Sequence, residues 1–119
     1  MRQIAIDLET FGTSSNSVII AIGAAEFDLY TGEILHRFYA PVDPDSCGFF
    51  GMKYDGSTIR WWLDQSKDAV EALGPPEEAL GIQLALVALN EWVTMEEHLP
   101  DKDVAVYGNG SKFDLTILE

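Results

Sequence analysis

Residues 18–25 form an unbroken apolar run, VIIAIGAA, and this run restricts the possible folds more than any other feature of the sequence. A strand with one face in water alternates apolar and polar residues, whereas a run that is apolar at every position has to be covered on both faces. The run is far shorter than the roughly 20 residues that cross a bilayer. It therefore predicts a central strand of a sheet in a one-domain protein, for which 119 residues suffice.

Turn and strand signals place two further strands beside this one. Residues 2–8 carry Ile4 and Ile6 on one face, and a turn at residues 30–32 joins the strands 18–28 and 34–40 into a hairpin. Residues 10–16 and 41–56 are rich in Gly, Ser, Pro and Asp and are expected to be loops. The first part of the chain is thus predicted to be a three-stranded meander.

Helix signals follow in the second half of the chain. Ser57 and Ser66 are good N-caps for helices over residues 58–65 and 67–73. A longer helix is expected from near Pro76 to before Pro100, because apolar residues repeat there at helical spacing. They form two neighbouring rows: Leu80, Leu84 and Val87 in one, and Ile82, Leu86, Leu89 and Val93 in the other.

The chain continues with a short strand at residues 103–107, a turn at 108–110 and a helix from Ser111. Three meandering strands followed by a helical crossover predict an α/β fold with a mixed sheet, in which the last strand is parallel to the first. If these two strands are neighbours, their C-terminal ends lie side by side. Open α/β sheets place their binding sites at such an edge.

Three acidic residues are expected to meet at this edge. Asp7 and Glu9 end the first strand, on the same face and about 7 Å apart, and Asp114 lies in the first turn of the last helix. Carboxylates select hard cations, so the group predicts Mg²⁺ or Mn²⁺, two of which could activate a water for phosphodiester hydrolysis. Structural interpretations remain open: a solvated strand end for Asp7 and Glu9, and a capping box from Ser111 for Asp114.

Net charge opposes a nucleic-acid substrate. Twenty acidic against seven basic residues give −13, which repels phosphates at long range and by itself favours a binder of cations or basic proteins. Divalent ions at a carboxylate site reverse the potential locally. The charge therefore weakens a nuclease interpretation without excluding it.

The single cysteine and the histidines predict no further site. Cys47 has no partner for an internal disulfide, which favours a cytoplasmic protein, and no His/Cys cluster around it predicts zinc. His36 and His98 are interpreted as surface or strand residues. The sequence shows neither a signal peptide nor a membrane-spanning run, so we expect no membrane partner.

The tryptophans have two interpretations. Trp61 and Trp62 follow a helix N-cap, so at least one of them should face the core. Packing or a subunit interface is favoured over stacking on nucleic-acid bases. Trp92 is expected in the core or at an interface, and Arg60 and Lys67 on a solvated surface.

Two short motifs resemble those of a known family. Asp7-Leu8-Glu9-Thr10, followed by Gly12, resembles the first exonuclease motif of the DEDD family of 3′–5′ exonucleases. Residues 109–114 (NGSKFD) resemble its second motif, N-x-x-x-F-D after a strand. Residues 18–27 and 57–66 are similar to a small phage and bacterial subfamily of RNase H-like exoribonucleases. The resemblance covers nearly the whole chain.

This resemblance implies an RNase H-like fold and a hydrolase with two Mg²⁺ or Mn²⁺ ions. Such an enzyme removes 5′-mononucleotides from the 3′ end of a single-stranded nucleic acid. By similarity Asp7 bridges both ions, Glu9 is a ligand that also meets the terminal nucleotide, and Asp114 holds metal through water.

The resemblance also implies substrate-binding residues. Thr10 and Phe11 lie beside the 3′-terminal nucleotide by similarity: the N–H of Thr10 would bind its 3′ end, and Phe11 would pack against its base. Ordinary turn packing is the equally supported alternative for both. Asn109 and Phe113 of the second motif complete the implied set.

The family pattern extends beyond what this sequence holds. Members carry a fourth carboxylate on a later helix, preceded by a His or Tyr general base, and neither follows Asp114 here. We therefore expect residues 1–119 to be one exonuclease-like domain, incomplete at its C-terminus, without its C-terminal helices and weakly active or inactive alone. An exposed sheet edge predicts a possible homodimer.

Two other functions remain open at this point. One is a non-catalytic remnant that binds nucleic-acid ends or a protein, which the net charge favours. The other is a different RNase H-like phosphoryl-transfer enzyme, such as an endonuclease. The sequence does not choose between RNA and DNA.

Overall fold

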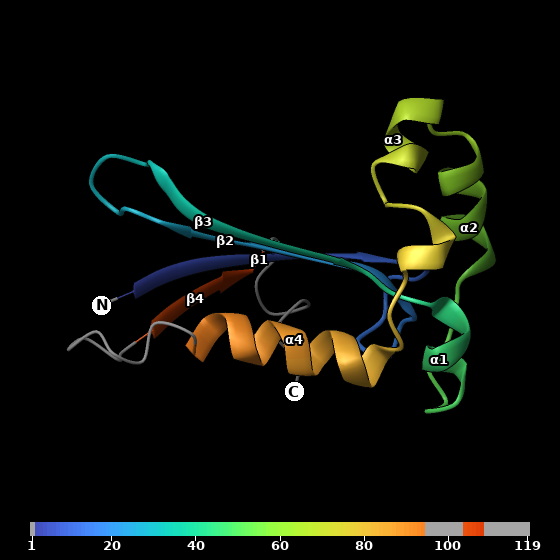
Figure 1. Ribbon diagram of the computed structural model, residues 1–119. Helices are drawn as coiled ribbons and strands as arrows, with labels where there is room; N and C mark the ends of the chain where they lie inside the picture. Colours follow the sequence, from blue (N-terminus) through green and yellow to red (C-terminus); the bar gives the residue numbers. More distant parts are fainter. Residues whose placement is uncertain (1, 95–103, 109–119) are drawn as a thin grey trace.

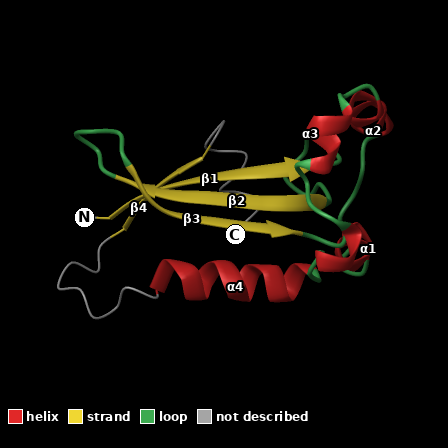
Figure 2. Cartoon of the chain, turned by 45° about the horizontal axis from the view of Figure 1, so that its top comes forward, coloured by secondary structure: helices red, strands yellow, loops and turns green. Residues whose placement is uncertain are grey.

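The computed structural model of the protein describes residues 2–94 and 104–108 (Figure 1). Its four strands form one sheet, α4 lies along one face of the sheet, and α1, α2 and α3 gather at one end (Figures 1 and 2). No helix in the described ranges is long and apolar enough to cross a membrane. The elements are β1 (Arg2–Thr10), β2 (Ile19–Phe27), β3 (Ile34–Pro41), α1 (Pro44–Gly48), α2 (Gly56–Leu63), α3 (Lys67–Glu71), the 3₁₀ helix η1 (Pro76–Glu78), α4 (Ile82–Thr94) and β4 (Val104–Gly108).

The sheet has the strand order β3-β2-β1-β4. β2 pairs with both β1 and β3 in antiparallel register, and β4 pairs with β1 in parallel. The prediction of a mixed sheet, with the last strand parallel to the first, is confirmed. The apolar run also has its expected place, because β2 is an interior strand and residues 18–22 are all buried.

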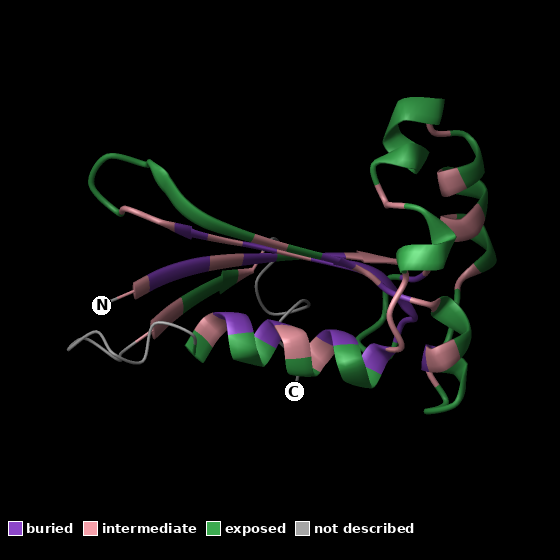
Figure 3. Ribbon diagram, viewed as in Figure 1, coloured by how far each residue is buried: buried purple, intermediate pink, exposed green. Residues whose placement is uncertain are grey.

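The two faces of the sheet differ in cover. One of them, here called the covered face, packs against α4, whose buried stripe is turned toward the sheet (Figure 3). The rings of Phe38 on β3 and Trp92 on α4 are 5.8 Å apart there. The opposite face, here called the open face, carries the alternate residues of each strand. The core of the covered face includes Ile4, Ile6, Leu8, Ile22, Ala24, Ala40, Ile82, Ala85, Leu89 and Trp92.

The long helix begins later than predicted, at Ile82 rather than near Pro76. Residues 76–78 form η1 instead, and Leu80 then adopts an extended conformation at the end of the sheet. The Leu80 N–H donates to the Pro41 carbonyl at 2.9 Å, and the Leu80 carbonyl accepts from the Asp43 N–H at 2.7 Å. A residue that bridges the sheet in this way cannot continue a helix, so the tertiary contact overrides the helical pattern.

Only one of the two predicted apolar rows of α4 is the core stripe. Ile82 and Leu89 are buried, and so is Trp92, as predicted, whereas Leu84 and Val87 are exposed. Periodicity predicted the helix correctly but did not decide which row faces the sheet.

The predicted loop at residues 41–56 contains the short helix α1. Asp43 caps this helix by accepting from the Asp45 N–H at 3.0 Å, and Pro44 fills its first turn. Cys47 lies in α1 rather than in a loop and is fully buried. The loop was predicted from the high content of Gly, Pro and Asp in this segment, and the helix-start signal of Asp43 followed by Pro44 was overlooked.

The start of α2 also differs from the prediction. Asp55, not Ser57, is the N-cap, and its carboxylate accepts from the Ser57 N–H at 3.0 Å. Asp and Ser are similarly good caps, so the sequence does not choose between them. Ser66 caps α3 by accepting from the Ala69 N–H at 3.1 Å, as predicted.

One buried ion pair ties the N-terminal end of β1 to the rest of the core. Arg2 Nη2 lies 2.7 Å from Glu26 Oε1 and Nε lies 3.1 Å from the same oxygen, with both side chains 9% exposed. Arg2 Nη1 donates to the carbonyl of Val93, so the pair joins β1, β2 and the C-terminal part of α4. Removal of one partner would leave the other charge buried without compensation.

We expect Glu26→Gln to lower the free energy of unfolding by about 3 kcal/mol, because Arg2 then stays buried without its counter-charge. Urea denaturation followed by circular dichroism measures this change. The control Glu33→Gln removes an exposed carboxylate in the β2–β3 connection and should change stability by about 0.5 kcal/mol or less. Equal effects of the two substitutions would contradict the importance of the buried pair.

Candidate active site

Asp7 and Glu9 lie within the last part of β1, on the open face. The strand runs to Thr10, so both carboxylates are held by sheet pairing rather than by a loop. Leu8 between them is buried, whereas Asp7 is exposed and Glu9 is half-buried. Their partners on β2 are Gly23 and Ala21. Gly23 leaves an open depression beside Asp7, whereas Ala21 is fully buried.

The end of β4 reaches the same place. In the parallel pairing Gly108 lies opposite Ile6, one residue before Asp7. The sequence prediction that these two strand ends lie side by side is therefore confirmed. Asn109, Phe113 and Asp114 lie outside the described residues, so their predicted roles at the site stay predictions.

A shallow depression of about 640 Å³ opens on this face next to Asp7. Its floor is made of Ala5, Gly23 and Ala25. Arg37 contributes a basic side chain to its lining. Tyr39 and Tyr107 also line it, from the two strands that flank the central pair.

Tyr39 joins β3 to the segment after α3. Its hydroxyl donates to the Leu73 carbonyl at 2.9 Å. Burial raises the pKa of Tyr39, and the nearby negative charge of Glu9 raises it further. The phenol therefore stays protonated at neutral pH and keeps its hydrogen bond beside the carboxylate.

The segment after Glu9 is held by the region around α2. The Trp62 Nε1–H donates to the Thr10 carbonyl at 3.0 Å, and the Asp55 N–H donates to the Phe11 carbonyl at 2.7 Å. The Phe11 N–H in turn donates to the Val18 carbonyl at 2.9 Å. The backbone at residues 10 and 11 is thus fixed from two sides.

Close packing also holds the rest of this turn. A Cβ at Gly12 would lie 2.4 Å from Ser17 Oγ, which is closer than atoms of real side chains approach. That oxygen donates to the Ser14 carbonyl at 2.7 Å and accepts from the Ser14 N–H at 3.1 Å, so it has little freedom to move. The glycine that follows the DLET motif is therefore required by the shape of the turn.

Phe11 is placed by its packing. Its ring is half-buried against the hydrophobic core. It also lines a second cavity of about 430 Å³, together with Pro41, Leu73 and Pro75. Turn packing thus accounts for the position of Phe11, and its contact with a terminal base stays a prediction.

The carboxylates fit a hard divalent cation. Asp7 and Glu9 offer oxygen ligands on one face with access to solvent, which suits Mg²⁺ or Mn²⁺ with water in the remaining positions. Two carboxylates do not make a closed site. No group of three or more His, Cys, Asp or Glu side chains gathers within residues 2–94 and 104–108. A further ligand has to come from another segment, and Asp114 is the residue predicted for it.

The other titratable candidates lie apart from this site. His36 is exposed on β3, in agreement with its interpretation as a strand residue. The Cys47 thiol is fully buried in α1, and burial raises its pKa, which disfavours a reactive thiolate at neutral pH.

Sequence reasoning missed Tyr39 and the anchoring of Thr10 by Trp62. The period-two pattern of β3 places Tyr39 and Arg37 on one face. Their approach to Glu9 and Asp7 depends on the register of three strands, which the sequence does not specify. The Trp62 contact spans 52 positions and has no local signal.

Comparison with known proteins decides the family. The model of the 3′-5′ exoribonuclease Rv2179c-like domain matches residues 2–119. The chain belongs to this family. The membership confirms the resemblance to 3′–5′ exonucleases that residues 7–12 and 109–114 carry in the sequence.

Relatives of this family member include an exodeoxyribonuclease of Enterobacteria phage T4. The two are 26% identical over 125 residues, which cover 99% of this chain and 54% of the phage protein. The chain thus spans about half the length of that relative.

Solved structures agree on the fold. The nuclease domain of 3′hExo, a DEDDh family member bound to rAMP, superposes with a TM-score of 0.60 at 17% identity, covering 98% of this chain and 57% of the other. A full-length 3′-exonuclease superposes with a TM-score of 0.58 at 16% identity, covering 90% and 33%. At these identities the likeness establishes the fold alone.

We expect Tyr39→Phe to lower the free energy of unfolding by about 1 kcal/mol near neutral pH, through loss of the hydrogen bond to Leu73. The folded-state pKa of Tyr39 lies above its unfolded value, so the stabilising contribution is complete below pH of about 10 and is lost as pH rises through the folded pKa. Thermal melts between pH 7 and 11 should show a difference that shrinks at the alkaline end.

The matched control for this prediction is Tyr30→Phe. Tyr30 is 95% exposed in the β2–β3 connection, so its substitution should leave stability unchanged at every pH. A loss of stability in Tyr39→Phe that is equally large at pH 7 and pH 11 would contradict the prediction that ionisation of Tyr39 removes its stabilising contribution.

Proposed function

We propose that this protein is a metal-dependent 3′–5′ exonuclease that hydrolyses single-stranded nucleic acid and releases 5′-mononucleotides. The main support is the position of the family's first motif. Asp7 and Glu9 lie on one face at the C-terminal end of β1, directly beside the end of β4. Open α/β sheets carry their sites at such an edge.

Asp7 and Glu9 would hold the divalent ions, with Asp114 of the second motif as the third carboxylate. When bound, Mg²⁺ or Mn²⁺ ions activate a water molecule and stabilise the leaving oxygen of a phosphodiester. The protein contributes rigid placement: sheet pairing holds both described carboxylates, and Trp62 and Asp55 hold the backbone that follows them. Such fixed geometry lowers the cost of aligning the reacting groups.

Bound cations would also offset, at the site, the repulsion between the negative chain and a nucleic acid. A net charge of −13 repels a polyanion at a distance, whereas divalent ions at Asp7 and Glu9 create a positive potential where a phosphate must bind. Arg37 adds a basic side chain in the adjoining depression. Substrate capture should therefore depend on the metal more strongly than in a basic nuclease.

The substrate class is a single strand with a free 3′ end, of RNA or DNA. The family model is described as an exoribonuclease domain, while the T4 relative is an exodeoxyribonuclease. The two descriptions differ in the sugar and agree on nucleic acid. Both sugars therefore belong in the first assay.

An activity assay tests the proposal with 5′-labelled single-stranded RNA and DNA oligonucleotides. With Mn²⁺ we expect stepwise shortening from the 3′ end, lost by about a thousandfold or more in Asp7→Ala because ion binding is disrupted. Asp45→Ala, which removes an exposed carboxylate in α1, should retain activity. Turnover unaffected by Asp7→Ala would sink the proposal, and cleavage of a circular substrate would indicate an endonuclease. The rate for residues 1–119 tests the expectation of weak activity.

A metal titration separates this proposal from a non-catalytic remnant. Ions that bind the folded protein raise its melting temperature, by about 5 °C at ten times the dissociation constant. We expect such a rise with Mn²⁺ or Mg²⁺ in the wild type and in Asp45→Ala, and no rise in Asp7→Ala. Absence of any shift at millimolar ion in the wild type would favour the remnant.

A further inference from the structure

Trp61 is a large aromatic side chain that the fold leaves in solvent. It lies on α2 and is 54% exposed, while its neighbour Trp62 is half-buried and packs against the hydrophobic core. The prediction that at least one of the pair faces the core is confirmed by Trp62. Within the chain Trp61 contacts the ring of Trp62 edge to face, and the rest of its surface is available to a ligand.

Trp61 is connected to the candidate active site through Trp62. The two indole rings meet edge to face, with centroids 5.0 Å apart and an interplanar angle of 84°. Trp62 donates its Nε1–H to the carbonyl of Thr10, the residue that follows Glu9. Trp61 thus contacts the ring that anchors the backbone directly after Glu9.

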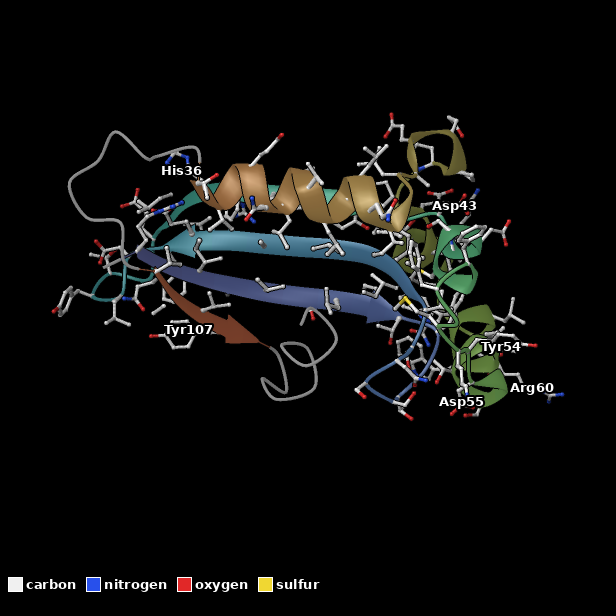
Figure 4. All side chains as sticks on the ribbon, turned by 90° about the horizontal axis from the view of Figure 1, so that it is seen from below. His36, Asp43, Tyr54, Asp55, Arg60 and Tyr107 are labelled. Atoms are coloured by element: carbon white, nitrogen blue, oxygen red, sulfur yellow. The ribbon has the colours of Figure 1, made fainter. Side chains whose placement is uncertain are left out.

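The surface around Trp61 differs in charge from the rest of the chain. Residues 53–67 hold three of the seven basic residues and two of the twenty acidic ones, Asp55 and Asp64. Because Lys67 lies 3.7 Å from Glu71, Lys53 and Arg60 balance the two acidic residues, and the segment is close to neutral in a strongly negative protein. Arg60 extends outward from α2 at the same end of the molecule as Tyr54 (Figure 4).

We propose that Trp61 and Arg60 form a subsite for the nucleotide that precedes the 3′-terminal one: the base stacks on the Trp61 ring and Arg60 contacts a backbone phosphate. This proposal rests on the function proposed above. Exposed aromatic rings beside basic side chains bind single strands in this way, because every base has a π-face and the contact tolerates sequence. The charge of Arg60, next to Trp61 in α2, disfavours an apolar protein partner at this position.

The test compares an oligonucleotide with a mononucleotide in binding to Trp61→Ala. The probes are a fluorescently labelled single-stranded tetranucleotide with phosphorothioate linkages, as RNA and as DNA, and an unlabelled 5′-mononucleotide, all with Mg²⁺. We expect the tetranucleotide to bind about tenfold more weakly to the variant, for either sugar. The affinity of the mononucleotide should stay within about twofold, because it does not reach the subsite.

Tyr30→Ala is the matched control, since Tyr30 is 95% exposed in the β2–β3 connection, at the opposite end of the sheet from α2. It should leave the affinities of both probes unchanged. Arg60→Gln should reduce the slope of log affinity against log salt by about 1 for the tetranucleotide. Melting temperatures of all variants identify any that fail to fold. If Trp61→Ala fails to fold, Trp61→Phe takes its place: it keeps a stacking ring and should bind the tetranucleotide as the wild type does.

Four outcomes decide the matter. A selective loss of tetranucleotide binding in Trp61→Ala supports the subsite. Equal losses for both probes overturn it, because they indicate damage to the terminal-nucleotide site. Unchanged tetranucleotide binding overturns it as well and leaves Trp61 to a protein interface. If neither probe binds the wild type, the proposed exonuclease function itself fails, which is distinguishable from failure of the subsite alone.

Discussion

The parallel pairing of β4 with β1 is the constraint on which the site depends. Gly108 lies opposite Ile6, so the chain leaves β4 one residue short of Asp7. Without this pairing, Gly108, the residue just before the second motif, would have no fixed place relative to Asp7. The antiparallel pairing of β1 with β2 then fixes the pleat, which turns Asp7 and Glu9 away from α4.

A second set of contacts gives this edge its rigidity. Hydrogen bonds from Trp62 and Asp55 reach the carbonyls of Thr10 and Phe11, and the turn that follows is closed tightly around Gly12. The backbone beside the carboxylates is therefore held by residues more than forty positions away. α2 serves two purposes in this arrangement, because one face of it anchors the turn and the other presents an aromatic surface to solvent.

The charge of the protein is distributed unevenly between the site and the rest of the surface. The protein carries −13, yet Arg37 lines the depression beside Asp7, and Arg60 lies on α2, the helix whose Trp62 anchors Thr10. Cations at Asp7 and Glu9 would make this edge locally attractive to phosphates while the remaining surface stays repulsive. Such a distribution favours engagement of a strand at one place and disfavours general adhesion to nucleic acid.

The sequence by itself determined the mixed sheet, the interior place of the apolar run, the α4 helix and the carboxylate pair at the end of β1, because hydrophobic periodicity and strand alternation are local properties. Only the tertiary structure decided that Leu80 bridges the sheet instead of extending α4, that Tyr39 lies beside Glu9 and that Trp62 anchors Thr10. These three depend on strand register and long-range hydrogen bonds, whose partners are far apart in the chain and leave no periodic signal.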